Sequence, residues 1–298
     1  MTPQPLQPAA DFATRAPRAA RLDAQSRRVD IGPSHARVRW RGWGQDDTGR
    51  RPLVLLHGGH GNWMHWVRNV EPLAEDRAVW VPDMPGFGES DAVEEGGLDT
   101  LLDRLLHGIA HLPGAREHGI DLAGFSFGGL VAAHVAARVA QAGPVAGRPK
   151  VHHLLLLGPA GHGGTRRPRG ALQDWRPAAR AQDDAVLAAV MRHNLLMHML
   201  YDEAAIDAEA IALHTLACRS TRFRSKPLSF AGGLQPLLAA HAGPLAALWG
   251  AHDVTAEPAQ AASLVGCPTH VVTGAGHWVQ YEAAPQANDW LRGALEGS

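Results

Sequence analysis

Apolar residues in the first half of the chain fall into short runs separated by longer amphipathic segments. Residues 36–40 alternate between apolar and polar side chains, so residues 26–32 and 34–44 are predicted to form an antiparallel hairpin. Short, mainly apolar runs follow at residues 52–56, 78–81, 119–123 and 151–157, and the first of them is continuous. Such runs are typical of strands buried on both faces, and helix-spaced apolar residues separate them. The alternation predicts an α/β fold, with a mostly parallel sheet covered by helices on both faces.

This alternation stops after residue 160. Residues 161–233 have a polar, helical pattern, with arginine and proline clustered near their start. Strand character returns at residues 245–249 and 269–273, and a final helix is predicted from about 285 to 295. The middle segment therefore reads as a helical insertion placed after a strand.

The predicted domain organisation follows from these breaks. Residues 26–160 and 234–298 form the α/β core, and residues 161–233 form an inserted helical cap, or lid. Residues 1–25 are rich in alanine, proline and arginine and lack the apolar stretch of a secretory signal. We predict that they form a flexible N-terminal arm that packs on the surface.

Composition excludes several classes of function. Apolar residues make up 45% of the chain and charged residues 19%, and the formal net charge is −1, so neither a nucleic-acid nor a membrane partner is expected. No run approaches the roughly 20 apolar residues that span a bilayer. The two cysteines, Cys218 and Cys267, imply no disulfide scaffold, which favours a reduced, cytoplasmic location. The expected partner is a small-molecule substrate, and a homodimer stays open.

The strongest local signal is the segment Gly-Phe-Ser-Phe-Gly-Gly at residues 124–129, between a predicted strand and a predicted helix. It has the G-x-S-x-G pattern of a sharp turn that leaves its central serine exposed at the edge of the sheet. Glycine is required on both sides because the two backbones pass too close for a Cβ atom. The following helix directs free N–H groups at the turn, where an oxyanion would develop. We interpret Ser126 as a nucleophile.

A serine hydroxyl needs a base to take its proton, and that base needs an acid to orient it. In this architecture the acid and then the base follow the serine, on loops after later strands. Asp253 follows the predicted strand 245–249, and His277 follows the predicted strand 269–273. The alternative acid position, residues 158–161, contains no carboxylate. We therefore predict Asp253 as the acid and His277 as the base.

Two backbone N–H groups are predicted to bind the oxyanion. One belongs to Phe127, directly after the nucleophile, and the other to Gly59, in the glycine-rich turn after the first parallel strand. The glycines of that turn suit a backbone whose amides face inward. His57 and His60, in the same turn, are interpreted as structural or substrate-lining groups rather than as catalytic ones.

With these residues assembled, the chain resembles the α/β-hydrolase superfamily from about residue 26 to about residue 296. The matching segments are residues 55–59, 83–90, 124–129, 249–253 and 276–277. Residues 276–282 also look like the histidine segment of the meta-cleavage-product hydrolases, which hydrolyse a carbon–carbon bond in vinylogous 1,5-diketones. Further similarity to that group lies in the cap, at residues 199–202 and at Arg219, Arg222 and Arg224.

Two positions depart from that group. Phe125 precedes the serine, where the group usually carries asparagine, and residues 59–62 replace its Ser-Gly-Pro-Gly turn. The sequence therefore predicts a soluble, cofactor-free serine hydrolase acting on a small, largely apolar carbonyl compound, most simply a carboxylic ester. The alternative is a C–C hydrolase of 2-hydroxy-6-oxo-dienoates. A more remote alternative is a small-molecule receptor that keeps the triad.

Candidate substrate contacts are His60, Phe125, Arg222, Arg224 and Trp278. The two arginines are candidates for binding a substrate carboxylate. No metal is predicted, because neighbouring residues of a strand, such as His152 and His153, point to opposite faces. No cofactor is predicted either, since the glycine-rich residues 158–164 lack the Gly-Lys-Ser/Thr ending of a phosphate loop.

Overall fold

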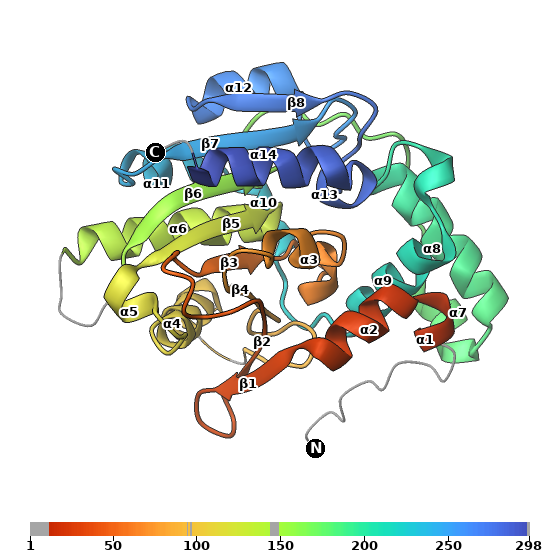
Figure 1. Cartoon of the computed structure of the whole chain (residues 1–298). Helices are drawn as coiled ribbons and strands as arrows, with labels where there is room; N and C mark the ends of the chain where they lie inside the picture. Colours follow the sequence, from red (N-terminus) through yellow and green to blue (C-terminus); the bar gives the residue numbers. More distant parts are fainter. Residues whose placement is uncertain (1–11, 94, 96, 144–148, 297–298) are drawn as a thin grey trace.

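A computed structural model describes residues 12–93, 95, 97–143 and 149–296 and places eight strands in one sheet (Figure 1). The strand order is β1-β2-β4-β3-β5-β6-β7-β8. The strands are β1 (Arg27–Ile31), β2 (Val38–Trp43), β3 (Leu53–Leu56), β4 (Val79–Pro82), β5 (Ile120–Phe125), β6 (Val151–Leu157), β7 (Leu245–Gly250) and β8 (Thr269–Val272). β2 pairs antiparallel with β1 and β4, and all other neighbours are parallel. The predicted fold class and hairpin are confirmed.

Alternate side chains of the inner strands enter two separate hydrophobic clusters. In β3, Leu53 and Leu55 join the cluster on one face, whereas Val54 and Leu56 join the cluster on the other. Because both faces are buried, the inner strands favour apolar residues at successive positions, as in β3. The buried polar pair Asp121 and His153, in β5 and β6, is hydrogen-bonded at 2.7 Å.

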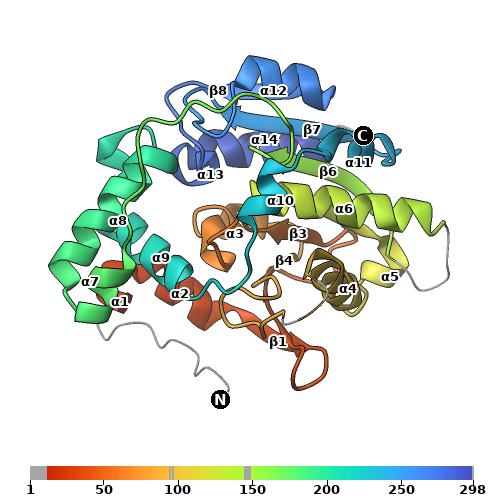
Figure 2. The same ribbon diagram turned by 180° about the vertical axis from the view of Figure 1, so that it is seen from behind.

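Helices cover both faces of the sheet. Figure 1 shows α3 and α14 in front of the strands, and Figure 2 shows α4 and α6 in front of them from behind. The helices of the core are η1 (Trp63–Trp66), α3 (Val70–Leu73), α4 (Gly97–Ile109), α5 (Ala115–His118), α6 (Phe127–Gln141), α11 (Leu234–Ala239), α12 (Pro258–Val265), α13 (Val279–Glu282) and α14 (Ala284–Glu296). The predicted final helix corresponds to α14.

Residues 161–233 lie between β6 and α11 and contain no strand. Their helices are α7 (Arg176–Ala181), α8 (Asp184–His198), η2 (Glu203–Ala205), α9 (Ala208–Arg219) and α10 (Lys226–Phe230). Figure 1 shows α8 and α9 on the side of the molecule toward which the parallel strands point. Residues 161–175, which the sequence pattern included in the helical segment, form no helix. The helices of this insertion therefore begin at residue 176.

The N-terminal segment differs from the predicted flexible arm. Its first 11 residues lie outside the described part, but α1 (Phe12–Arg15) and α2 (Pro17–Gln25) are ordered helices, and α1 packs beside α9. Ala16, Ala19 and Leu22 are fully buried, and Trp43 Nε1–H donates to the carbonyl of Leu22 at 3.0 Å. Residues three apart on a helix share one face, so these three apolar side chains form the buried face of α2. The high content of arginine and proline in this segment made the buried face hard to recognise in the sequence.

Within the described ranges, no helix is long and apolar enough to cross a membrane. Both cysteines are free: Cys218 is buried on α9, and Cys267 is half-buried before β8. The described part also holds no cluster of three histidine, cysteine or acidic side chains arranged to bind a metal ion.

Candidate active site

Ser126 occupies the sharp turn between β5 and α6. Its backbone lies at φ 54° and ψ −119°, a conformation that is strained for a residue with a side chain. A Cβ added at Gly124 would lie 2.3 Å from the carbonyl oxygen of Gly128, and one added at Gly128 would lie 2.3 Å from that of His57. The turn therefore needs both glycines, as the sequence pattern predicted.

Replacing Gly128 with alanine is expected to lower the free energy of unfolding by at least about 3 kcal/mol, because the new methyl group meets rigid backbone on β3. For a chain of this size, Tm should fall by roughly 6–12 °C in calorimetry. Gly293→Ala is the matched control, since nothing lies within 4 Å of its Cβ position and it lies inside α14. That variant should keep or raise Tm. Equal Tm values for wild type and Gly128→Ala would contradict the close approach.

The structure brings the three predicted catalytic side chains together. His277 Nε2 lies 2.9 Å from Ser126 Oγ, and His277 Nδ1 lies 2.8 Å from Asp253 Oδ2. Asp253 and His277 are buried, whereas Ser126 is half-exposed. The hydroxyl is therefore the one member of the chain of hydrogen bonds that is open to a substrate.

Asp253 is fully enclosed by donors. Its Oδ1 accepts from the backbone N–H and the hydroxyl of Thr255, both at 2.7 Å. Burial alone would raise the pKa of Asp253, but the charge and hydrogen bond of His277 and the bonds from Thr255 outweigh it and hold the pKa below its usual value. The acid therefore stays ionised and keeps a proton on His277 Nδ1. Sequence reasoning missed Thr255, although it lies two residues after the acid.

Residue 158 is the alternative position for the acid, after β6. Gly158 has φ 48°, and a Cβ added there would lie 2.9 Å from Asp253 Oδ2 and 3.2 Å from His277 Nδ1. The space that a carboxylate at this position would fill is thus already occupied by the carboxylate of Asp253.

The predicted oxyanion donors lie beside the serine. A Cβ added at Gly59 would lie 3.6 Å from Phe127 Cβ, so the turn after β3 passes next to the start of α6. Among the described residues, neither the Gly59 nor the Phe127 N–H has an acceptor, whereas Gly58 N–H donates to His65 Nδ1 at 3.1 Å. Ser225, which the sequence reasoning missed, lies over the turn, with Oγ 2.5 Å from the Cβ position of Gly59.

His57 has a structural place, as predicted. Its Nε2 accepts from Met84 N–H at 2.9 Å, and burial lowers its pKa to about 4, so the ring is neutral. Asp83 accepts from the backbone N–H groups of Trp63 at 2.8 Å and Glu89 at 3.0 Å. These two side chains join the loops after β3 and β4 and fix the turn that carries Gly59.

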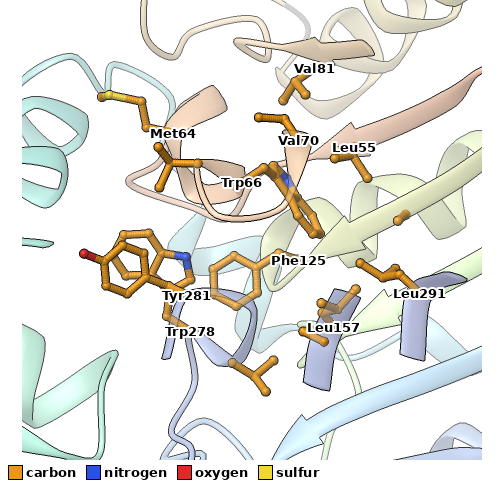
Figure 3. Close-up of a cluster of buried hydrophobic side chains, with 14 of the residues drawn as sticks. Leu55, Met64, Trp66, Val70, Val81, Phe125, Leu157, Trp278, Tyr281 and Leu291 are labelled. Carbon is orange, nitrogen blue, oxygen red and sulfur yellow. The ribbon is translucent and has the colours of Figure 1, made fainter. Parts of the chain in front are cut away.

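Phe125 and Trp278 lie differently from their predicted role as substrate contacts. Both are buried, at 1% and 0% exposure, within the cluster of Figure 3. Phe125 has its ring centroid 4.9 Å from that of His277, and Trp278 donates its backbone N–H to the carbonyl of Met199 at 2.7 Å. Phe125 packs against His277 from the core side, and neither side chain presents free surface to a substrate.

The arginines predicted to contact a substrate differ in their surroundings. Arg222 donates to the backbone carbonyls of Ser220, Gly88 and Ser90, so it ties the cap to the loop after β4 instead of being free for a carboxylate. Arg224 is exposed between α9 and α10. His60 is exposed in the turn after β3, with φ 52°.

These geometries agree with comparisons to known proteins. The sequence matches the alpha/beta hydrolase family over residues 53–289. The chain belongs to this family. The fold is accordingly the α/β-hydrolase fold, which the sequence resemblance implied.

Relatives of this hydrolase include several kinds of enzyme. It is 30% identical over 82% of its length to the dihydrolipoyllysine-residue acetyltransferase component of an acetoin cleaving system from Pseudomonas putida, but it spans only 63% of that relative. It is 26% identical to a 2-hydroxy-6-oxononadienedioate/2-hydroxy-6-oxononatrienedioate hydrolase of Klebsiella pneumoniae, over 80% of this chain and 85% of the relative. Carboxylesterase CesB from Bacillus subtilis has a similar fold, with a TM-score of 0.68, 16% identity, and coverage of 96% and 98% of the two chains.

One further residue of this hydrolase escaped the sequence reasoning. Glu282, on α13, accepts hydrogen bonds from the backbone N–H groups of Tyr201 at 2.9 Å, Asp202 at 2.7 Å and Gly276 at 2.6 Å. We call this set of bonds the Glu282 clamp. It joins the segment that follows α8 to the residue just before His277. Tyr201 and Asp202 are far from Glu282 in the sequence, so the sequence pattern did not predict these hydrogen bonds. The one available signal was that Glu282 ends the histidine segment, residues 276–282.

Proposed function

We propose that this α/β hydrolase is a serine esterase that cleaves small carboxylic esters with Ser126, His277 and Asp253. The observation that supports it best is the continuous set of hydrogen bonds from the half-exposed hydroxyl, through a buried imidazole at 2.9 Å, to a buried carboxylate at 2.8 Å. A serine in that arrangement is activated for attack on a carbonyl carbon.

The proposed reaction has two steps. Ser126 Oγ attacks the ester carbonyl while His277 Nε2 takes its proton, and Asp253 stabilises the imidazolium that forms. The N–H groups of Phe127 and Gly59 donate to the oxyanion of the tetrahedral intermediate. His277 then gives its proton to the departing alcohol, which leaves an acyl group on Ser126. Water, activated by the same imidazole, releases the acid and restores the serine.

C–C hydrolysis of a ring-cleavage product is the second candidate. The near full-length similarity to the Klebsiella dienedioate hydrolase favours it. Phe125 argues against it, because this phenyl ring precedes the nucleophile, is buried, and has no group that could hydrogen-bond a dienolate. An ester needs only the nucleophile, the base and the oxyanion donors.

We therefore expect kcat/KM for an activated short-chain aryl ester, such as 4-nitrophenyl butyrate, to exceed that for a 2-hydroxy-6-oxo-dienoate. Both rates are measured by absorbance on one preparation, with Ser126→Ala as the blank. Faster cleavage of the dienoate would reverse the order of the two candidates. If neither substrate gave more than a few turnovers per molecule, the esterase proposal itself would fail and a receptor role would gain support.

A further inference from the structure

Arg166 stands apart from the other arginines of the described ranges. All the other buried or half-buried ones donate hydrogen bonds or form ion pairs, as Arg41 does with Asp23 and Asp83. Arg166 is half-buried and has neither. Its Cζ lies over the ring of Phe230, 3.8 Å from the centroid, and this cation–π contact holds the side chain without neutralising it.

Arg166 is held at the edge of the candidate active site. The adjacent Arg167 donates its backbone N–H to Val254 O at 2.8 Å and its guanidinium to the carbonyls of Ala251 and Asp253 at 2.9 and 3.0 Å. These bonds fix the start of the cap segment against the loop of the catalytic acid. The position of Arg166 is therefore set by a neighbour whose donors are satisfied, while its own donors are left open.

The charge of Arg166 has no available counter-ion. The carboxylate that acts on it is that of Asp253, and both oxygens of that group are already bound by Thr255 and His277. Burial lowers the pKa of Arg166, so its surroundings disfavour the cation. The guanidinium therefore keeps its N–H donors free for an anion, and its partial burial strengthens the attraction to one.

The neighbours of Arg166 show on which side of the candidate active site it lies. Burial, together with the charges of His277 and Arg166, lowers the pKa of His198 to about 3, and the ring of His198 lies 5.8 Å from that of His277. The next residue, Arg167, donates its backbone N–H to Val254 O beside the acid, and the acid is hydrogen-bonded to His277 at 2.8 Å. Arg166 therefore lies on the side of the base, which gives its proton to the departing alcohol.

We propose that Arg166 binds a carboxylate on the leaving-group part of the substrate, so that the preferred esters carry an acid on their alcohol or phenol portion. This inference rests on the proposed esterase function and narrows its substrate class. A single guanidinium matches one carboxylate through two parallel N–H···O bonds. Arg166 takes the role that the sequence assigned to Arg222 and Arg224.

The test compares 4-acetoxybenzoate with 4-acetoxybenzamide, which has a similar shape but no charge. Arg166→Gln should lower kcat/KM for the acid about 30-fold and change that for the amide less than threefold. Arg166→Lys should recover part of the loss, because it keeps the charge without the planar fork. Arg180→Gln, which removes an exposed cap arginine on α7, is the matched control and should affect neither substrate.

Two further measurements separate this role from a structural one. Arg166→Gln should keep Tm within about 3 °C of wild type, since no ion pair is lost. In a Ser126→Ala background, calorimetry should show 4-acetoxybenzoate binding about 30-fold more weakly once Arg166 is replaced. This binding result is independent of turnover, so it can succeed or fail separately from the esterase proposal. Equal losses on acid and amide, a large fall in Tm, or a dependence shown only by 4-nitrophenyl hydrogen glutarate, whose acid is on the acyl side, would each overturn the inference.

Discussion

Ser126→Ala is expected to lower kcat for an aryl ester by on the order of 10⁶-fold, the loss found when the nucleophile of such a triad is removed. No other hydroxyl can replace it, because Ser126 Oγ is the atom that lies 2.9 Å from His277 Nε2. Alanine keeps the Cβ atom of serine, and Gly124 and Gly128 are unchanged, so the variant should keep the turn and its oxyanion donors.

The measurement is ester hydrolysis together with labelling by a fluorophosphonate, followed by peptide mass analysis. Wild type should carry one label, on Ser126, and the variant should carry none. Ser229→Ala on α10 is the matched control, since its hydroxyl bonds only to the carbonyl of Ser225. It should retain both labelling and turnover. Ester turnover within tenfold of wild type in Ser126→Ala would disprove the assignment of the nucleophile.

Asp253→Asn is expected to lower kcat on the order of 10⁴-fold while the protein stays folded. An amide at this position donates toward His277 Nδ1, so the imidazole is held in the tautomer whose Nε2 carries the proton and cannot accept one from Ser126. The Thr255 donors that now satisfy Oδ1 would still find an acceptor if the amide oxygen faces them. The substitution therefore changes which nitrogen of His277 carries the proton and leaves the packing around residue 253 largely as it was.

Steady-state kinetics and circular dichroism check this together. His277→Gln should be at least as damaging, because it removes the base itself. Thr255→Val is the informative companion: it removes one of the donors that favour the ionised acid, so the pKa of Asp253 should rise, which a carboxyl NMR titration would report. Nearly unchanged activity in Asp253→Asn would require another carboxylate, and Gly158 occupies the alternative place.

Sequence reasoning succeeds where the structure is determined locally or by a strong motif. The continuous apolar run of β3 and the glycines around Ser126 follow from burial on two faces and from close backbone contact, which a linear pattern records directly. The order of serine, acid and histidine placed Asp253 and His277 at neighbouring strand ends, and the structure finds them 2.8 Å apart.

It fails where a side chain's role depends on distant neighbours. Arg166 and Arg167 are adjacent and identical in type, yet one is bound to three carbonyls and the other has no polar partner. Nothing in the pattern of either residue separates them. Phe125 shows the same limit, since the identity of the residue before the serine does not tell which way its ring points.

The Glu282 clamp has a consequence for anyone who exchanges caps between such hydrolases. Because Glu282 accepts from Tyr201, Asp202 and Gly276, the segment that follows α8 is tied to the loop of His277. A chimera whose junctions fall at residues 161 and 233 would replace Tyr201 and Asp202 but keep Glu282 and Gly276. The position of His277 could then change, and a shift of about 1 Å at a catalytic base can reduce a rate 100-fold. Grafts should therefore retain residues 199–202 with the host. The unit that can be transplanted is therefore smaller than residues 161–233, because residues 199–202 are anchored to the α/β core through Glu282.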